Sequence, residues 1–351
     1  MHRMHLRAQT MASLRMFLVV GMMMMIIMHS PMVIVGDKIG IGVCYGMVAN
    51  NLPSATDVIS LYKKYNIGKL RLFDPNPDAL EALKGSGIDV ALGLKNEDIP
   101  SIATSTEGAE SWFTTNVLPY LSNITFSFIS VGNEAIPGEF ANDVAPAMSN
   151  LQAVLNDHNL NGITVTTAVA TMVLGVSYPP SAGQFSPETK GALADVLSFL
   201  SIKGSPLMAN VYPYFAYASD PDQVRLDYAL FTAKDPVVVD GNLSYHNLFD
   251  ATVDSFYWAM EKQGVNNVGV AVSESGWPSA GNGGFTTPEL ASTYNRNFMQ
   301  HVLNMGGTPK RPGAYIEGFI FAMFNENQKP SGIEQNWGLF YPNMQPVYAV
   351  F

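Results

Sequence analysis

Residues 268–278 read Val-Gly-Val-Ala-Val-Ser-Glu-Ser-Gly-Trp-Pro, an apolar run that stops at the carboxylate of Glu274. A second run, Phe128-Ile-Ser-Val131, stops in the same way just before Gly-Asn-Glu134. A short apolar run followed by small and polar residues is typical of a buried strand that ends in a loop. Two carboxylates at strand ends, far apart in sequence, are what acid/base chemistry on a glycosidic bond requires.

Short apolar runs alternate with helix-length amphipathic segments along residues 39–351, without a repeat, a charge block or a Ser/Gly-rich linker. The runs predict strands over Ile39–Val43, Lys69–Leu72, Val90–Leu94, Phe128–Val131, Ile163–Ala168, Pro206–Val211, Val268–Ser273 and Gly318–Phe321. Helices are predicted over Ser54–Tyr65, Pro77–Lys84, Glu107–Leu121, Ala141–His158, Pro187–Ser201, Leu248–Gln263 and Pro288–Asn304. This alternation indicates an α/β fold, a closed (β/α)8 TIM barrel. An open doubly wound sheet is the alternative, but the glycines of residues 40–46 lack the Gly-x-Gly-x-x-Gly spacing.

The segment Ala216–Asn247, after the sixth predicted strand, is longer than a barrel loop needs. Within it, Tyr228–Phe231 and Val237–Val239 predict a small hairpin beside that strand. We therefore expect a small subdomain in this loop region, placed where it builds one wall of a cleft.

The first 36 residues predict a signal peptide, with an approximate boundary near Gly36, and leave residues 37–351 as a single barrel domain. Arginines at positions 3, 7 and 15 surround an apolar core, Phe17–Met28, of 12 residues. That core is too short to span a bilayer comfortably, so no membrane anchor is expected. A secreted, extracellular location is expected.

Two sequence motifs fit the secretory route. Asn123-Ile-Thr and Asn242-Leu-Ser are acceptor sequences for N-glycosylation. The single cysteine, Cys44, excludes an internal disulfide, and its apolar surroundings favour a buried, inert thiol over a nucleophile. A hydrophobic fraction of 47% is enough for a core that needs no crosslinks.

Charge excludes several classes of partner. The full chain has a formal net charge of −10, and without residues 1–36 it keeps 16 basic against 29 acidic residues, a net charge of −13. An acidic chain does not favour nucleic acid or an anionic membrane, whereas a neutral glucan is compatible with it. The six His are scattered, and no Gly-x-Ser-x-Gly elbow or P-loop occurs. No metal and no cofactor are therefore expected.

In a barrel, the carboxyl ends of all strands meet at one face. Glu134 follows the fourth predicted strand and Glu274 ends the seventh, so the two carboxyls are predicted to face each other across the barrel mouth. A separation of about 5 Å would allow double displacement with retention. A single Glu at such a position would more often cap a helix or lie in a solvated loop, but two in this placement favour the catalytic interpretation.

Other side chains at strand ends are candidates for the same site. Asn133 offers an amide to a sugar hydroxyl or is simply a turn residue. Tyr212 is predicted to donate its hydroxyl to the nucleophile. Aromatic faces for sugar rings are predicted at Tyr45, Tyr214, Phe215, Trp277 and Phe324, with an aromatic core under a loop as the alternative. Glu326, Lys329 and Glu334 form either an ion-paired network that tunes the catalytic carboxylates or a solvated cluster without effect on rate.

These motifs resemble those of the plant β-1,3-glucanases of glycoside hydrolase family 17. The resemblance covers roughly residues 39–351 and rests on Ile41-Gly-Val-Cys-Tyr-Gly-Met, Val131-Gly-Asn-Glu, Ala209-Asn-Val-Tyr-Pro-Tyr-Phe, Val272-Ser-Glu-Ser-Gly-Trp-Pro-Ser and Phe321-Ala-Met-Phe-Asn-Glu-Asn-Gln-Lys. It implies a (β/α)8 barrel and endo-hydrolysis of β-1,3-glucan with retention. It also implies that Glu274 is the nucleophile and Glu134 the general acid/base, with Glu326, Lys329 and Glu334 as auxiliary charged residues. The chain stops at Phe351, without the C-terminal extension that some relatives have, so the resemblance implies the apoplast or cell wall as its location. A role in plant defence or the cell wall is implied by analogy.

Two departures from the family pattern are visible. Arg71-Leu-Phe73 stands where the family commonly has Arg-Ile-Tyr, and we expect the missing hydroxyl to reduce the rate without abolishing function. The loop before Glu334 is one residue shorter than usual. Cleavage of mixed-linkage β-1,3-1,4-glucan, transglycosylation on the same fold, and a barrel that binds glucan without cleaving it remain open as alternatives. A monomer is expected.

Overall fold

The structure is a computed structural model that describes residues 39–351. The predicted signal peptide, residues 1–36, lies outside the described residues. The described residues, 39–351, belong to one compact unit.

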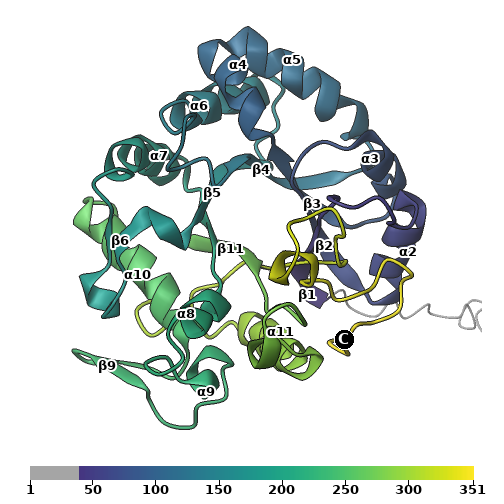
Figure 1. Cartoon of the computed structure of the whole chain (residues 1–351). Helices are drawn as coiled ribbons and strands as arrows, with labels where there is room; N and C mark the ends of the chain where they lie inside the picture. The colour runs from purple at the N-terminus through teal and green to yellow at the C-terminus, as the bar shows by residue number, and fades with distance from the viewer. Residues whose placement is uncertain (1–38) are drawn as a thin grey trace, which may run out of the picture. The chain divides into compact units, whose positions relative to one another are not determined.

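Eight parallel strands close into a barrel in the order β1-β12-β11-β8-β5-β4-β3-β2, as the sequence predicts (Figure 1). They are β1 (Ile39–Tyr45), β2 (Ile67–Leu72), β3 (Asp89–Leu94), β4 (Thr125–Asn133), β5 (Thr164–Ala170), β8 (Leu207–Asn210), β11 (Val270–Ser275) and β12 (Gly318–Ile320). Most of their side chains are buried, because the barrel interior covers one face and the outer helices cover the other. This double burial explains why the strands read as continuous apolar runs.

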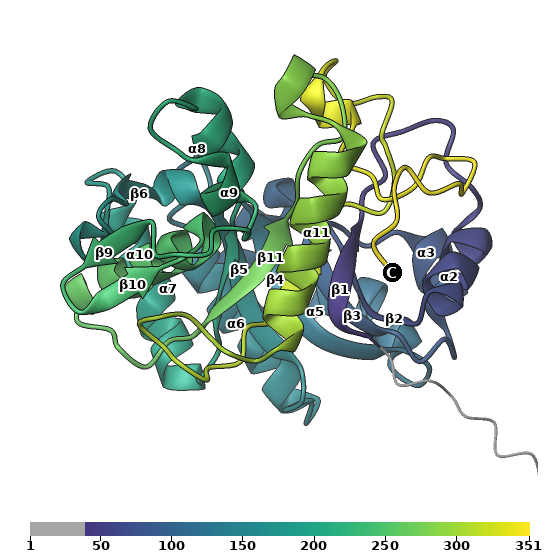
Figure 2. The same ribbon diagram turned by 90° about the horizontal axis from the view of Figure 1, so that it is seen from below.

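Helices surround the strands (Figures 1 and 2). They are α2 (Ala55–Lys64), α3 (Pro77–Leu83), α4 (Ile99–Thr104), α5 (Thr106–Asn116), α6 (Val144–Asp157), α7 (Lys190–Lys203), α8 (Pro213–Ser219), α9 (Leu226–Ala229), α10 (Leu248–Lys262) and α11 (Pro288–Leu303). Polar caps fix several starts: the Ser54 hydroxyl accepts from the Asp57 N–H at 3.2 Å, and the Thr287 hydroxyl accepts from the Leu290 N–H at 3.2 Å.

One predicted helix, Glu107–Leu121, ends early. Helix α5 stops at Asn116 and is followed by a 3₁₀ turn, Leu118–Tyr120. Pro119 accounts for the difference, because its ring lacks the N–H that a continuing α-helix would use and clashes with the preceding turn.

The segment after β8 differs from the predicted hairpin. Tyr228 lies in helix α9, so the strand predicted over Tyr228–Phe231 is wrong. The hairpin is instead formed by β9 (Val238–Asp240) and β10 (Leu243–Tyr245), which pair antiparallel. Gly241, with φ of 63°, opens the two-residue turn between them, a position that favours glycine.

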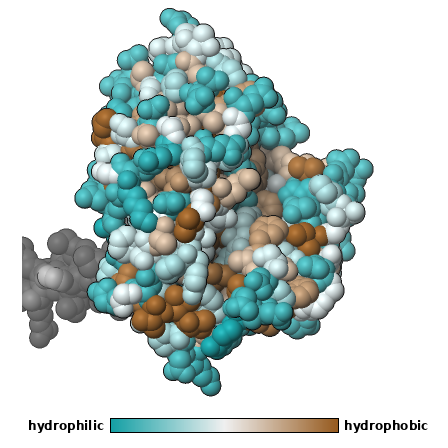
Figure 3. Space-filling view, turned by 60° about the vertical axis from the view of Figure 1, so that its left-hand side comes forward, coloured by the Kyte–Doolittle hydropathy of each residue, from teal (hydrophilic) through white to brown (hydrophobic). Residues whose placement is uncertain are grey.

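Another small two-stranded sheet, β6 (Leu174–Val176) with β7 (Gln184–Phe185), lies between β5 and α7 along the chain. A groove with apolar side chains on both sides runs across one face of the molecule (Figure 3). Within residues 39–351, no helix combines the length and apolar character needed to cross a bilayer.

Candidate active site

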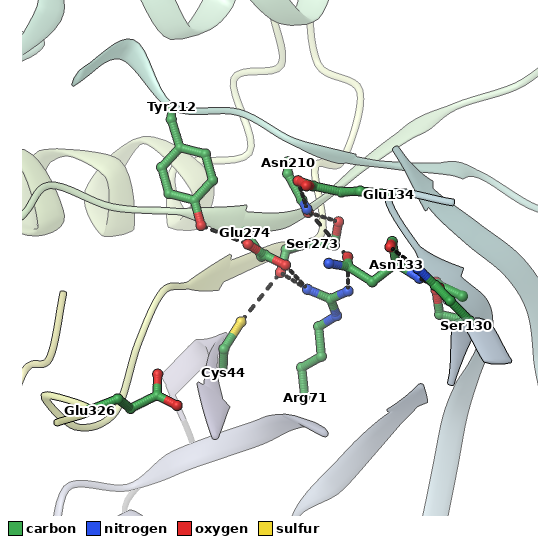
Figure 4. Close-up of polar contacts among 12 residues, drawn as sticks. Cys44, Arg71, Ser130, Asn133, Glu134, Asn210, Tyr212, Ser273, Glu274 and Glu326 are labelled. Atoms are coloured by element: carbon green, nitrogen blue, oxygen red, sulfur yellow. Dashed lines mark hydrogen bonds and ion pairs between the residues drawn. The ribbon is translucent and has the colours of Figure 1, made fainter. Parts of the chain in front are cut away.

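Glu134 and Glu274 both line a cavity of about 460 Å³ at the carboxyl end of the barrel strands (Figure 4). Glu134 directly follows β4, and Glu274 is the fifth residue of β11. The barrel places β5 and β8 between these two strands, so the carboxylates come from separated positions on the rim. The cavity is lined by Tyr45, Gly46, Met47, Val48, Leu72, Phe73, Asp74, Asn133, Glu134, Tyr212, Phe215, Glu274, Phe321, Glu326, Lys329, Glu334 and Trp337.

The backbone around Glu134 adopts an uncommon conformation. Glu134 has φ of 53°, the left-handed region that side chains other than glycine rarely occupy, and its N–H donates to the Ala168 carbonyl at 2.8 Å. Gly132 precedes it with φ of 73°, and a Cβ there would lie 2.7 Å from the Asn96 Oδ1. Asn96 Oδ1 in turn accepts from the Asn133 N–H at 2.8 Å. Residues kept in such uncommon backbone conformations cluster at functional sites.

Glu274 accepts a hydrogen bond on each carboxylate oxygen. Its Oε1 accepts from Arg71 Nη1 at 2.6 Å, and its Oε2 accepts from the Tyr212 hydroxyl at 2.7 Å (Figure 4). The predicted hydrogen bond from Tyr212 is therefore present. Burial and the neighbouring Glu274 raise the pKa of Tyr212 well above its ordinary value, so the phenol keeps its proton and donates it.

Sequence reasoning assigned no role to Arg71, although this side chain connects both halves of the site. It lies near the end of β2 and is only 1% exposed. Besides Glu274, it donates through Nη2 to Asn133 Oδ1 at 2.8 Å, and Phe73 lies with its ring centroid 4.4 Å from the guanidinium carbon. A lone arginine among the apolar residues of a strand was the sequence feature that could have revealed it, because a buried charge needs a partner.

Asn210, the last residue of β8, is the second residue missing from the predicted site. Its Nδ2 donates to Glu134 Oε1 at 2.7 Å and lies 3.3 Å from Asn133 Oδ1. Its Oδ1 accepts from the Ser273 hydroxyl at 2.7 Å. The Asn-Val-Tyr-Pro-Tyr-Phe motif that begins at this residue was noted for its aromatic residues only.

The two carboxyls have different electrostatic surroundings. Burial and, to a smaller extent, the charge of Glu274 raise the pKa of Glu134, while the hydrogen bond from Asn210 acts in the opposite direction. Glu274 is instead in a buried ion pair with Arg71. Glu134 is thus the carboxyl favoured as a proton carrier, whereas Glu274 has a cation beside one of its oxygens.

The family is decided by comparison with known proteins. The sequence profile of glycosyl hydrolases family 17 matches residues 41–351. The chain belongs to glycosyl hydrolases family 17. A probable glucan endo-1,3-beta-glucosidase of Arabidopsis thaliana is 51% identical over 313 residues, which cover 89% of this chain and 90% of that protein. A lichenase of Hordeum vulgare is 50% identical over 310 residues, 88% of this chain and 97% of that protein.

Solved structures agree with this assignment. One of two plant beta-glucan endohydrolases described as having distinct substrate specificities is 49% identical and matches with a TM-score of 0.85, covering 88% of this chain and 99% of its own. A beta-1,3-glucanase and allergen of Cryptomeria japonica pollen is 48% identical, also with a TM-score of 0.85, covering 88% and 98%. The family resemblance inferred from the motifs is confirmed, and this family 17 chain is a glycoside hydrolase.

The three auxiliary charged residues lie on the wall formed by the loop after β12. Lys329 Nζ lies 3.1 Å from Glu326 Oε2, and the other oxygen of Glu326 accepts from the Val48 N–H at 2.7 Å. Glu326 therefore binds the loop after β1 and contacts neither Glu134 nor Glu274 directly. The charge of Glu334 contributes to raising the pKa of Glu134, as the last of several causes.

The predicted sugar-contacting aromatics divide into two groups. Tyr45 and Phe215 line the cavity, and Phe215 is 46% exposed. Tyr214, Trp277 and Phe324 are almost fully buried and do not line it, so their assignment as sugar platforms is wrong. Trp277 and Tyr214 pack edge to face, with ring centroids 5.2 Å apart, in the core beneath the loops.

Trp337, which sequence reasoning did not single out, lines the cavity. Its ring packs against that of Phe215, with centroids 5.8 Å apart, so the two form a continuous apolar wall. Asn133 also lines the cavity. Its Oδ1 is engaged by Arg71 and Asn210, which leaves the amide nitrogen as the end that can meet a sugar hydroxyl.

Buried Cys44 has its thiol 3.4 Å from the Ser273 carbonyl, and burial raises its pKa, so it has no thiolate character. Among residues 39–351, no group of three or more His, Cys, Asp or Glu is arranged to hold a metal ion.

Proposed function

We propose that this family 17 hydrolase is an endo-β-1,3-glucanase that cleaves by double displacement with retention. The observation that carries the proposal is the pairing of two cavity-lining carboxyls in different electrostatic settings: desolvation raises the pKa of Glu134, and Glu274 is ion-paired with Arg71. Relatives that are about half identical in sequence and named glucan endo-1,3-beta-glucosidases support the choice of substrate.

The reaction needs two steps. First, a carboxylate oxygen of Glu274 forms a bond to the anomeric carbon as the glycosidic bond breaks, and the proton of Glu134 passes to the leaving oxygen. Then Glu134, now a carboxylate, takes a proton from water while the water oxygen displaces Glu274 from the anomeric carbon. Glu134 regains its proton and the product keeps the β configuration. Arg71 and Tyr212 hold Glu274 in place in both steps.

Hydrolysis of laminarin tests the proposal. We expect the parent enzyme to release oligosaccharides, with β-anomers first in the NMR spectrum of the fresh products. Glu274→Gln should lose the activity. Glu134→Gln should lose most of it. With an aryl glycoside, whose leaving group departs without a proton, this variant should regain activity on addition of azide, which needs no acid/base for attack on the glycosyl-enzyme. Glu289→Gln, at an exposed carboxylate in the first turn of α11, is the matched control. α-Anomers as first products would exclude retention.

Mixed-linkage glucan is a second candidate substrate, because a relative of 50% identity is named a lichenase. Linkage choice depends on the shape of the cleft and on the groups that meet each sugar, which the two catalytic carboxyls do not determine. Parallel digestion of laminarin and lichenan, with product linkage analysis, separates the two activities. Products longer than the substrate would indicate transglycosylation, and binding without any cleavage would indicate a non-catalytic barrel.

We further propose a secreted, extracellular and monomeric glycoprotein, cleaved near Gly36, with a role in plant defence or the cell wall. The two acceptor asparagines, Asn123 and Asn242, are both exposed, Asn242 in the turn of the β9–β10 hairpin. N-glycosidase treatment should lower the mass of the parent protein and leave that of the Asn123→Gln/Asn242→Gln double variant unchanged. This result would support N-glycosylation at these two residues. The N-terminal sequence and light-scattering mass of protein from the culture medium test the remaining points.

A further inference from the structure

The hydrogen bonds around Glu134 have fixed directions, and Arg71 sets the first of them. A guanidinium can only donate, so the atom of Asn133 that lies 2.8 Å from Arg71 Nη2 must be its oxygen. The side-chain orientation of Asn133 is thereby fixed.

The next direction follows from the first. The amide of Asn210 approaches both Asn133 Oδ1, at 3.3 Å, and Glu134 Oε1, at 2.7 Å. Both of these atoms are acceptors, so the NH₂ group of Asn210 must face them. Its oxygen then faces Ser273 at 2.7 Å, and the Ser273 hydroxyl must donate.

This chain of donors is shielded from water. Asn210 is 1% exposed and Ser273 is fully buried, so neither amide orientation nor hydroxyl direction is set by solvent. Reversing the Asn210 amide would place its oxygen against two other oxygens, at a cost that grows in a low-dielectric interior.

We propose that Ser273 and Asn210 are a pair of positioning residues that decide which oxygen of Glu134 carries the catalytic proton. Ser273 holds the Asn210 amide in one orientation, and the amide keeps Glu134 Oε1 as a hydrogen-bond acceptor. The transferable proton is therefore on Oε2. The inference rests on the proposed role of Glu134 as general acid/base.

The consequence for the reaction is that Oε1 stays bonded to Asn210 throughout. In the first step the O–H bond at Oε2 breaks as its proton bonds to the leaving glycosidic oxygen. In the second step a water proton bonds to Oε2, and the water oxygen attacks the glycosyl-enzyme. A donor fixed on Oε1 also stabilises the carboxylate form against the burial that opposes it.

Ser273→Ala tests the pair, and Ser275→Ala is the matched control. Both serines lie buried in β11, but the Ser275 hydroxyl donates to the Val211 carbonyl at 2.7 Å and does not take part in the Asn210 contacts. We expect Ser273→Ala to move the basic limb of the kcat/KM profile on laminarin to higher pH by about one unit, because the donor to Glu134 is weakened. Ser275→Ala should leave that limb in place.

Asn210→Ala removes the donor altogether and should move the limb in the same direction. The double variant should then shift it no further than Asn210→Ala alone, since Ser273 acts only through Asn210. Additive shifts, or equal profiles for Ser273→Ala and Ser275→Ala, would overturn the proposal.

A ¹³C NMR titration of the Glu134 carboxyl in labelled protein gives the same comparison without relying on activity. If the parent protein were inactive on laminarin but Ser273→Ala still raised the pKa of Glu134 in this titration, the proposed function would be refuted and the positioning pair would stand. An active parent with no such shift would refute only the pair.

Discussion

Replacing Arg71 is the most direct perturbation of the site. This one side chain contacts Glu274 and also Asn133, the neighbour of Glu134, so it affects the surroundings of both proposed catalytic carboxyls. Its guanidinium donates to Glu274 Oε1 at 2.6 Å, to the Ser273 carbonyl at 3.2 Å and to Asn133 Oδ1 at 2.8 Å. Lysine keeps the charge, but its single ammonium on a straight stem cannot reach the same acceptors in the same geometry.

The expected magnitudes follow from these contacts. Arg71→Lys should lose the bond to Asn133 and weaken that to Glu274, at a cost of about 2–4 kcal/mol, or roughly 30- to 1000-fold in kcat/KM. Arg71→Met leaves Glu274 buried without a counter-charge, for which about 3–5 kcal/mol is typical.

Initial rates on laminarin between pH 4 and 8 measure both effects, and Lys69→Met serves as the control. Lys69 lies on the same strand and forms an ion pair with Glu317 at 2.6 Å at the opposite end of the barrel. The control separates loss of an ion pair as such from loss of this one. If Arg71→Met kept kcat/KM within about fivefold of the Lys69→Met value at every pH, the assigned role of Arg71 would be refuted.

Three further changes give distinct outcomes. Phe73→Tyr supplies a hydroxyl at the cavity wall and should raise kcat/KM by up to about tenfold, as one added hydrogen bond of roughly 0.5–1.5 kcal/mol allows; a rate no higher than the parent's contradicts this. Burial raises the carboxyl pKa of Asp254 from 3.8 to about 6, so the folded chain loses stability as pH rises through this window. Asp254→Asn should therefore raise the Tm at pH 8, with a gain of up to about 3 kcal/mol in the free energy of unfolding, and leave the Tm nearly unchanged at pH 4. An equal gain at both pH values would show that the ionisation of Asp254 is not its cause. Gly46→Ala places a methyl against the Glu326 carboxylate and should raise KM with unchanged pH limbs, whereas Gly191→Ala, with open space around it, should not alter KM.

The barrel could be predicted from sequence because each buried strand leaves an apolar run that ends at a polar residue. The same rule placed Glu134 and Glu274 at the mouth. It failed at Tyr228, where a four-residue apolar stretch begins inside the short helix α9, since so short a run has no period to distinguish helix from strand. It also failed at Trp277, because an aromatic beyond a strand end faces either the cavity or the core according to the path of the following loop.

Arg71 and Asn210 were missed for a different reason. Each is a single polar residue at the end of a strand, and its meaning depends on what the neighbouring strands bring within 3 Å. A sequence read one strand at a time contains both residues but not the contacts that each makes with neighbouring strands. These contacts arise only when the barrel closes.

The proposed division of labour between the two carboxyls depends on those same contacts. A carboxylate that accepts hydrogen bonds on both oxygens, one of them from a cation, is held in one orientation, which suits attack on carbon. Glu274 has this environment through Arg71 and Tyr212, whereas Glu134 receives one donor, from Asn210, and desolvation opposes its anionic form. Exchanging the roles would require the guanidinium to lie against Glu134 instead. Since Arg71 is fixed by the Ser273 carbonyl and by Asn133, the barrel holds it on the Glu274 side, and the two glutamates are not interchangeable.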